Sequence, residues 1–218
     1  MIFKYPSQAF YGKVIPKNKF YKNVAIPQKT KEMFVAQVKQ VRWMYKISPE
    51  TINILSTNTI LEIQVFEITL KKNQVSDFLL FSIDQAIQHP IIFEIVRDNG
   101  LQTICAFKSQ NILIGGKSKK LSRYFQSKIV DANTQRKNLD ISLNLGSTYY
   151  QIIELLCETN SRPREILSDY IQRDAEIFSK KREVQILQKK ILSCKQFNKK
   201  MQLNSKLRMI HKELEILV

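Results

Sequence analysis

The feature that most constrains the fold is the last quarter of the chain, where the helix-breaking residues disappear. From Pro163 to the end there is no glycine and no second proline, and strong helix formers dominate. As one continuous helix these 56 residues would span about 84 Å at 1.5 Å per residue. We therefore expect residues 161–218 to form a helical extension with its own packing.

The apolar residues of this extension follow two successive heptad patterns. The first runs through Val184, Leu187, Ile191, Cys194, Asn198 and Met201, and the second through Leu203, Leu207, Ile210, Leu214 and Leu217. The second pattern is displaced by two residues, which matches neither a four-residue stutter nor a three-residue stammer. The helix must therefore bend near Lys199–Asn204 or fold back as a helical hairpin, and both alternatives stay open. Six residues of these patterns form the predicted partner interface: Leu187, Ile191, Asn198, Leu207, Ile210 and Leu214.

The preceding residues predict an α+β core domain over 30–160 behind an extended basic N-terminal arm over 1–29, which holds three prolines. The spacing of Phe34, Val38, Val41 and Tyr45 predicts an amphipathic helix from Thr30 to Pro49. Further elements are expected in chain order: strands at 52–55 and 60–70, a helix at 75–88, a strand at 123–129 after a loop at 109–120, and a helix at 148–158 capped by Ser147.

Asn99-Gly100 is a strong signal for a type I′ turn between two strands. This turn pairs Arg97 with Gln102 and sets Lys108 opposite Ile91, on the other face from Glu94. Together these elements predict a small mixed or antiparallel sheet with packed helices, followed by a long C-terminal helix or coiled-coil-like hairpin.

The charge of the chain points to a polyanionic partner. Lys and Arg number 35 against 19 acidic residues, for a net charge of +16, and basic segments flank a near-neutral centre at 51–116. We expect nucleic acid, DNA in the first place, to be the partner. The predicted phosphate contacts are Lys117, Lys119, Lys120, Arg123, Lys189, Lys190, Lys199 and Lys200.

The sequence also argues for a cytoplasmic protein without a membrane partner. The apolar run Ile91–Val96 is interrupted by Glu94 and is too short to cross a bilayer. The first residues contain no apolar stretch of the kind found in a secretory signal.

An enzymatic role is the weaker alternative. A magnesium-dependent nuclease would need carboxylates and a lysine at neighbouring strand ends, and the candidates are Glu62, Asp84, Glu94 and Lys108. The acid two residues ahead of Lys108 is missing, because Ala106 stands there. Magnesium is expected only under this alternative.

Other cofactor sites are not indicated. Three scattered cysteines and two histidines have no zinc-site spacing, and the segment 111–118 lacks the first glycine of a phosphate-binding loop. We therefore expect no metal or cofactor in a non-catalytic protein.

Several blocks of sequence resemble the bacterial domain-of-unknown-function family 4391. These are TKEMFVAQVKQVRWMYKISPETINI, EIQVFEI, IDQAIQHPIIFEI, AFK and KQFNKKMQLN, in this order from about Pro16 onward. The resemblance brings no established catalytic residues. It implies a companion of helicases and DNA methyltransferases in restriction or phage-defence loci.

Three hypotheses follow. The first is a non-catalytic accessory subunit that contacts the nucleic-acid backbone and docks on a helicase or methyltransferase through its C-terminal helices. The second is the magnesium-dependent nuclease. The third is a structural protein that self-associates as a homo-oligomer through its tail.

Overall fold

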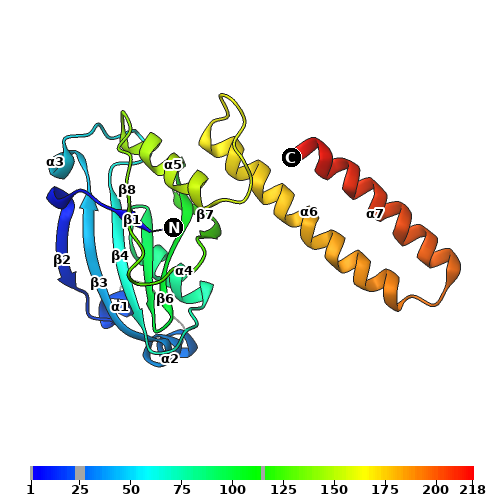
Figure 1. Cartoon of the computed structure of the whole chain (residues 1–218), viewed down its shortest axis with the longest axis horizontal. Helices are drawn as coiled ribbons and strands as arrows, with labels where there is room; N and C mark the ends of the chain where they lie inside the picture. Colours follow the sequence, from blue (N-terminus) through cyan, green and yellow to red (C-terminus); the bar gives the residue numbers. More distant parts are fainter. Residues whose placement is uncertain (1, 23–27, 114–115) are drawn as a thin grey trace. The chain divides into compact units, whose positions relative to one another are not determined.

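The computed structural model describes residues 2–22, 28–113 and 116–218, with the backbone alone at 21, 22, 29, 30, 109–113 and 116–120. The chain divides into two compact units, Met1–Cys157 and Glu158–Val218. The first is a mixed sheet with helices, and the second contains a hairpin of two long helices (Figure 1). The α+β class and the mixed sheet are as predicted from the sequence.

A six-stranded sheet with the strand order β2-β3-β4-β5-β6-β7 organises the first unit. Its strands are β2 (Phe10–Val14), β3 (Val38–Ile47), β4 (Ile63–Leu70), β5 (Ile91–Arg97), β6 (Gly100–Leu113) and β7 (Gly116–Gln126). Only β4 and β5 run parallel in this sheet of described residues. Helix α4 (Asp77–Ala86) connects them, because parallel neighbours need a crossover.

One face of the sheet packs on α1 (Asn18–Lys22), α2 (Gln28–Gln37) and α4. Alternate residues of the central strands, including Phe66, Ile68, Phe93 and Ile95, are buried there with Phe34, Leu79, Leu80 and Ile83 of the helices. This period-two burial is what a strand with one core-facing side requires.

Short elements cover the other face. They are β1 (Phe3–Lys4), which pairs in parallel with β8 (Lys137–Asn138), the short helices η1 (Ser7–Ala9) and α3 (Pro49–Ile52), and α5 (Leu145–Leu156). Helix α5 packs on β6 and β7, and the buried Tyr149 hydroxyl donates to the carbonyl oxygen of Ala106.

The helix expected from Thr30 to Pro49 is wrong over its second half. Helix α2 ends at Gln37, and residues 38–47 form β3. The register of β3 against β4 shifts between Val38 and Gln40, so Val38 and Val41 both reach the same core although they are an odd number apart. A β-bulge thus produces a spacing that resembles a helical stripe. Pro49 begins α3 with Ser48 as its N-cap.

The hairpin of β5 and β6 exists, but its register is two residues from the prediction. Arg97 pairs with Gly100, so Asp98 and Asn99 form the turn. Gly100 has a φ of +136°, and a Cβ atom there would lie 2.1 Å from the carbonyl oxygen of Val130. Gly100 is therefore needed for the close approach of the segment at Val130, and not as the second residue of a type I′ turn.

Three further segments differ from the prediction. The expected N-terminal arm contributes the edge strand β2 and helix α1. The expected strand at 52–55 is reduced to a single bridge at Leu55 next to α3. The loop expected at 109–120 is mostly strand backbone of β6 and β7, and Asn144 instead of Ser147 caps α5 by accepting from the Ser147 amide.

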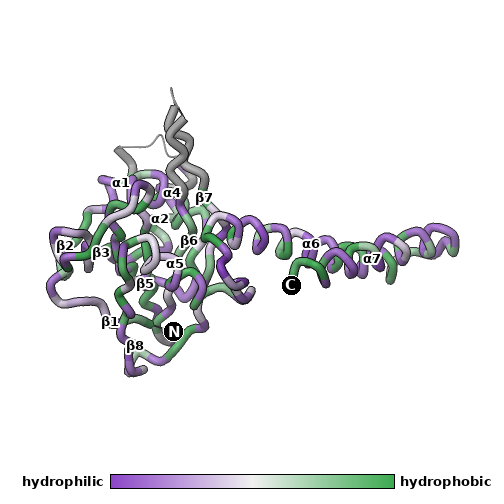
Figure 2. The backbone as a smooth tube through the Cα atoms, turned by 90° about the horizontal axis from the view of Figure 1, so that it is seen from above, coloured by the Kyte–Doolittle hydropathy of each residue, from purple (hydrophilic) through white to green (hydrophobic). Residues whose placement is uncertain are grey.

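The second unit resolves the alternative left open for the tail: it is a hairpin. Helix α6 (Leu167–Ser193) and helix α7 (Phe197–Leu217) are joined by three residues and pack on one another. Figure 2 shows apolar and polar residues alternating along both helices, as expected for two amphipathic helices. The chain reverses at 194–196, a few residues before the predicted bend, and this reversal explains why the heptad pattern changes phase.

Candidate nucleic-acid interface

Asp84 and Lys108, two of the four predicted nuclease residues, form a buried ion pair. Lys108 Nζ lies 2.8 Å from Asp84 Oδ1, and both side chains are 2% exposed. The ammonium also donates to the carbonyl oxygens of Asp84, Ile87 and His89 at 2.9, 3.2 and 2.9 Å. These carbonyls belong to the C-terminal end of α4 and the residues after it, so Lys108 acts as a cap for that helix end.

The other oxygen of Asp84 is also occupied. The Tyr124 hydroxyl donates to Asp84 Oδ2 at 2.6 Å. Burial, and then the negative charge of Asp84, raise the pKa of Tyr124 well above its ordinary value. The Tyr124 hydroxyl therefore keeps its proton at neutral pH and donates it to the buried carboxylate, which is the character of a structural network.

Glu62 and Glu94 lie elsewhere and have their own cationic partners. Arg136 binds Glu94 with two bonds of 2.7 and 3.0 Å on the face of the sheet opposite Lys108, as the alternation of β5 and β6 predicts. Glu62 Oε2 lies 3.5 Å from Lys46 Nζ, and Glu62 Oε1 accepts a hydrogen bond of 2.6 Å from Gln64 Nε2. The four predicted residues therefore do not form one site: Asp84 and Lys108 are in contact, whereas Glu62 and Glu94 pair with other residues.

Metal-ligating side chains do not gather elsewhere in the described part of the chain. Within residues 2–22, 28–113 and 116–218, no group of three or more His, Cys, Asp or Glu residues is placed to hold an ion. The geometry thus gives the nuclease alternative no support.

The predicted phosphate contacts fall into two groups. The side chains of Lys117, Lys119 and Lys120 lie outside the described residues, although their backbone belongs to β7. The guanidinium of Arg123 lies over the ring of Phe125, 4.6 Å from its centre. Lys189, Lys190, Lys199 and Lys200, in contrast, meet at one place.

That place is the turn of the helical hairpin, which we call the hairpin tip and define as residues 189–201. Lys190 lies in the last turn of α6 and Lys189 directly precedes it, whereas Lys199 and Lys200 lie in the first turn of α7. Lys195, which sequence reasoning missed, stands in the connection between them. All five lysines are exposed, and in the described part of the chain none of their ammonium groups has a carboxylate partner.

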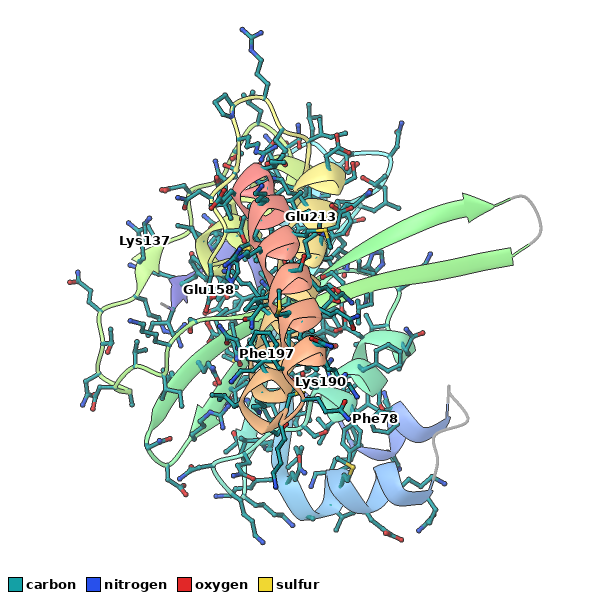
Figure 3. All side chains as sticks on the ribbon, turned by 90° about the vertical axis from the view of Figure 1, so that its right-hand side faces the viewer. Phe78, Lys137, Glu158, Lys190, Phe197 and Glu213 are labelled. Atoms are coloured by element: carbon teal, nitrogen blue, oxygen red, sulfur yellow. The ribbon has the colours of Figure 1, made fainter. Side chains whose placement is uncertain are left out.

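The charges of the hairpin are segregated along its length. From Val184 to Lys212, both included, there are eight Lys or Arg residues and no acidic one. Acidic residues pair with lysines nearer the open end of the hairpin: Lys180 Nζ lies 2.6 Å from Glu213 Oε2 and Lys206 Nζ lies 2.7 Å from Glu183 Oε1. Figure 3 shows Lys190 and Phe197 near the turn and Glu213 further along the hairpin.

The N-terminal end of α7, at the hairpin tip, has no side-chain cap and no negative charge beside it. Gln196 provides no side-chain cap, and the first turn contains no acidic residue. The N-terminal end of a helix carries a partial positive charge, and Lys199 and Lys200 add full positive charges beside it. A bound anion would relieve this repulsion, whereas a neutral partner would not.

The apolar pattern that predicted a partner interface is used by the hairpin itself. Leu187 and Ile210 are buried with Val184, and Leu203, Leu207 and Leu214 pack against them. Ile191 is half-buried and Asn198 is exposed at the tip. Docking on another protein stays a prediction, but these leucines no longer provide its basis.

Sequence reasoning could have located the tip more sharply. The stretch without acids from Val184 to Lys212 is visible in the sequence. Averaging charge over 161–218 hides it, because the acids before Val184 and after Lys212 dilute it. What the sequence could not supply was the reversal at 194–196 that brings the two lysine pairs together.

The fold and this tip define an α+β domain joined to a helical hairpin with a cationic end. The chain belongs to the family described as Domain of unknown function (DUF4391), whose model matches residues 3–214, so the resemblance noted in the sequence is confirmed. Searches of curated proteins and of solved structures found no match. In the described residues, no helix has both the length and the apolar character that spanning a bilayer demands.

Proposed function

We propose that the protein is a non-catalytic nucleic-acid-binding subunit that contacts the phosphate backbone through its hairpin tip. The observation that carries this proposal is the segregation of charge: five exposed lysines lie at the reversal between α6 and α7, and acidic residues of the hairpin pair with lysines away from it. Lysine ammonium groups bind phosphate as point charges with little sequence preference.

The setting we propose is a bacterial restriction or phage-defence complex in which a helicase or DNA methyltransferase performs the chemistry. The family resemblance suggests this setting. Such a subunit would supply affinity and position, and its partner would supply the reacting groups.

Neutralising the tip tests this proposal. The variant Lys189→Ala/Lys190→Ala/Lys199→Ala/Lys200→Ala removes four of the five tip charges. The matched control, Lys39→Ala/Lys72→Ala/Lys128→Ala/Lys137→Ala, removes four exposed lysines of the first unit and so lowers the net charge equally. Binding of a fluorescently labelled 20-nucleotide DNA, single-stranded or duplex, is followed by anisotropy at 50 mM salt.

We expect the tip variant to lose roughly 100-fold or more in affinity, because each phosphate contact contributes to counterion release. The control is expected to stay within about three-fold of the unchanged protein. Equal losses in both variants would mean that net charge alone attracts DNA, and an unaffected tip variant would remove the tip from the interface. Either result contradicts the proposal.

A further inference from the structure

The hairpin tip is apolar as well as cationic. Leu192, Phe197 and Met201 are 85%, 74% and 58% exposed, while the seam of the hairpin nearby is closed by Val184, Leu187 and Ile210. None of these three side chains belongs to the apolar cluster that joins the two helices. Their exposure has a cost in water, since a large apolar side chain in contact with solvent gains no burial energy.

Phe197 is the centre of this arrangement. It is the first residue of α7, and Met201, four residues later, lies on the same side of the helix one turn on. Lys200 is three residues from Phe197 and shares that side, while Lys195 precedes it by two residues in the connection. Figure 3 shows the labelled Phe197 at the turn end of the hairpin. An exposed aromatic ring thus lies on a helix end that has exposed lysines on both sides of it along the chain.

We infer that the tip binds single-stranded nucleic acid, with the ring of Phe197 stacked on an unpaired base and the lysines on the flanking phosphates. This inference rests on the proposed function and names its substrate class. Proteins that bind single strands combine a positive surface with an aromatic platform, and such stacking is tolerant of sequence because every base has a π-face.

A duplex does not fit the tip as well. Its bases are stacked on each other, so a protruding phenylalanine finds no free face and would meet sugar and phosphate groups. The lysines alone would suffice for a duplex, and the three apolar side chains would then have no use. The charge of this part of the hairpin favours a polyanion over a neutral apolar partner, because the segment from Val184 to Lys212, both included, has eight Lys or Arg residues and no acidic one.

Substitutions at Phe197 separate stacking from general apolar contact. Phe197→Leu keeps an apolar side chain and removes the π-face, whereas Phe197→Trp enlarges the π-face. Phe178→Leu is the matched control, because Phe178 is likewise an exposed phenylalanine of the hairpin but lies in α6, fifteen residues before the end of that helix. The probes are a labelled 20-nucleotide oligothymidine, a 20-base-pair duplex, and vesicles containing 30% phosphatidylserine.

We expect Phe197→Leu to weaken binding to the oligothymidine about ten-fold and to the duplex less than two-fold. Phe197→Trp should retain or strengthen single-strand binding, and Phe178→Leu should change neither. Equal weakening for both nucleic acids, or no weakening for the oligothymidine, would overturn the inference. Binding to the vesicles that is tighter than to the oligothymidine would overturn it in favour of a membrane surface.

These outcomes are distinct from failure of the proposed function. If removal of the tip lysines leaves all nucleic-acid binding intact, the proposed function fails and the inference fails with it. If the lysines matter and Phe197 does not, the tip remains a phosphate-binding surface and only the single-strand assignment is wrong.

Discussion

The buried Lys108 offers the most direct test of how the first unit is held together. The substitution Lys108→Met removes the ammonium that serves Asp84 and the carbonyl groups at the end of α4, and it leaves the side-chain volume nearly unchanged. A carboxylate that is 2% exposed then remains buried with Tyr124 as its donor. Leaving one member of a buried ion pair without its partner costs about 3–5 kcal/mol.

That cost is a large part of the 5–15 kcal/mol by which a domain is ordinarily stable. The double variant Asp84→Asn/Lys108→Met also removes the buried negative charge and keeps an amide oxygen that can accept from Tyr124. We therefore expect it to recover about half of the lost free energy of unfolding, although the carbonyl groups after α4 still lack their donor.

Urea unfolding followed by tryptophan fluorescence measures the stability of the first unit of the chain. Trp43 is the only tryptophan, lies in β3 and stacks on Phe66 with their ring centres 5.9 Å apart, so its signal reports the sheet and not the hairpin. With an m-value of about 2 kcal/mol per molar urea, the midpoint of Lys108→Met should fall by about 1.5–2.5 M. An unchanged midpoint would show that Lys108 is not structural. A double variant no more stable than Lys108→Met would show that the buried charge of Asp84 is not the cause of the loss.

Three further outcomes are expected. Leu187→Ala should destabilise the hairpin by about 2–4 kcal/mol, which amide exchange should report as faster exchange at 184–214. The control Ile186→Ala, at an exposed neighbouring position, should leave the exchange unchanged. Gly100→Ala should cost about 2 kcal/mol or more, because its Cβ would lie 2.1 Å from the Val130 carbonyl oxygen at a φ of +136°, and a midpoint equal to that of the unchanged protein would refute this. Burial raises the pKa of Glu67 in the folded protein, although Arg42 acts in the opposite direction. As pH rises, Glu67 therefore loses its proton in the unfolded chain before it does so in the folded one. Ionisation of Glu67 thus lowers the stability of the folded state as pH rises from the unfolded pKa to the folded pKa. Glu67→Gln should therefore gain stability relative to the unchanged protein at pH 7 and lose that gain below the ordinary range of glutamate, and a difference independent of pH would contradict this cause.

The elements that sequence patterns predicted best are those with regular periodicity. Strand β4 and helix α4 lie within three residues of the expected ranges, because Ile63–Leu70 alternates and the residues after Ser76 repeat at helical spacing. Strand β3 was missed for a physical reason: its bulges shift the register after Val38 and after Trp43, so its buried residues are spaced as in a helix. Local pattern alone does not distinguish these two structures.

Part of the candidate site could be predicted from the sequence. The lysine pairs and the two phases of the heptad pattern were readable, and the change of phase allowed a hairpin. The reversal of the chain is seen only in the structure, where Leu187 packs with Ile210. Residues that were expected to bind a partner are therefore buried within the hairpin, and Phe197 is exposed at the turn. The carboxylates illustrate the opposite case, because charge pairing across the fold, such as Arg136 with Glu94, is not encoded in any local spacing.

The dependence of binding on salt tests the central claim most directly. For a single strand, the slope of the logarithm of affinity against the logarithm of salt concentration is about −0.7 per phosphate contact. Removing Lys189, Lys190, Lys199 and Lys200 should therefore make the slope for oligothymidine shallower by about 3, measured by anisotropy between 50 and 200 mM salt. The control that removes Lys39, Lys72, Lys128 and Lys137 should leave the slope unchanged; a tip variant with the slope of the unchanged protein would contradict the account.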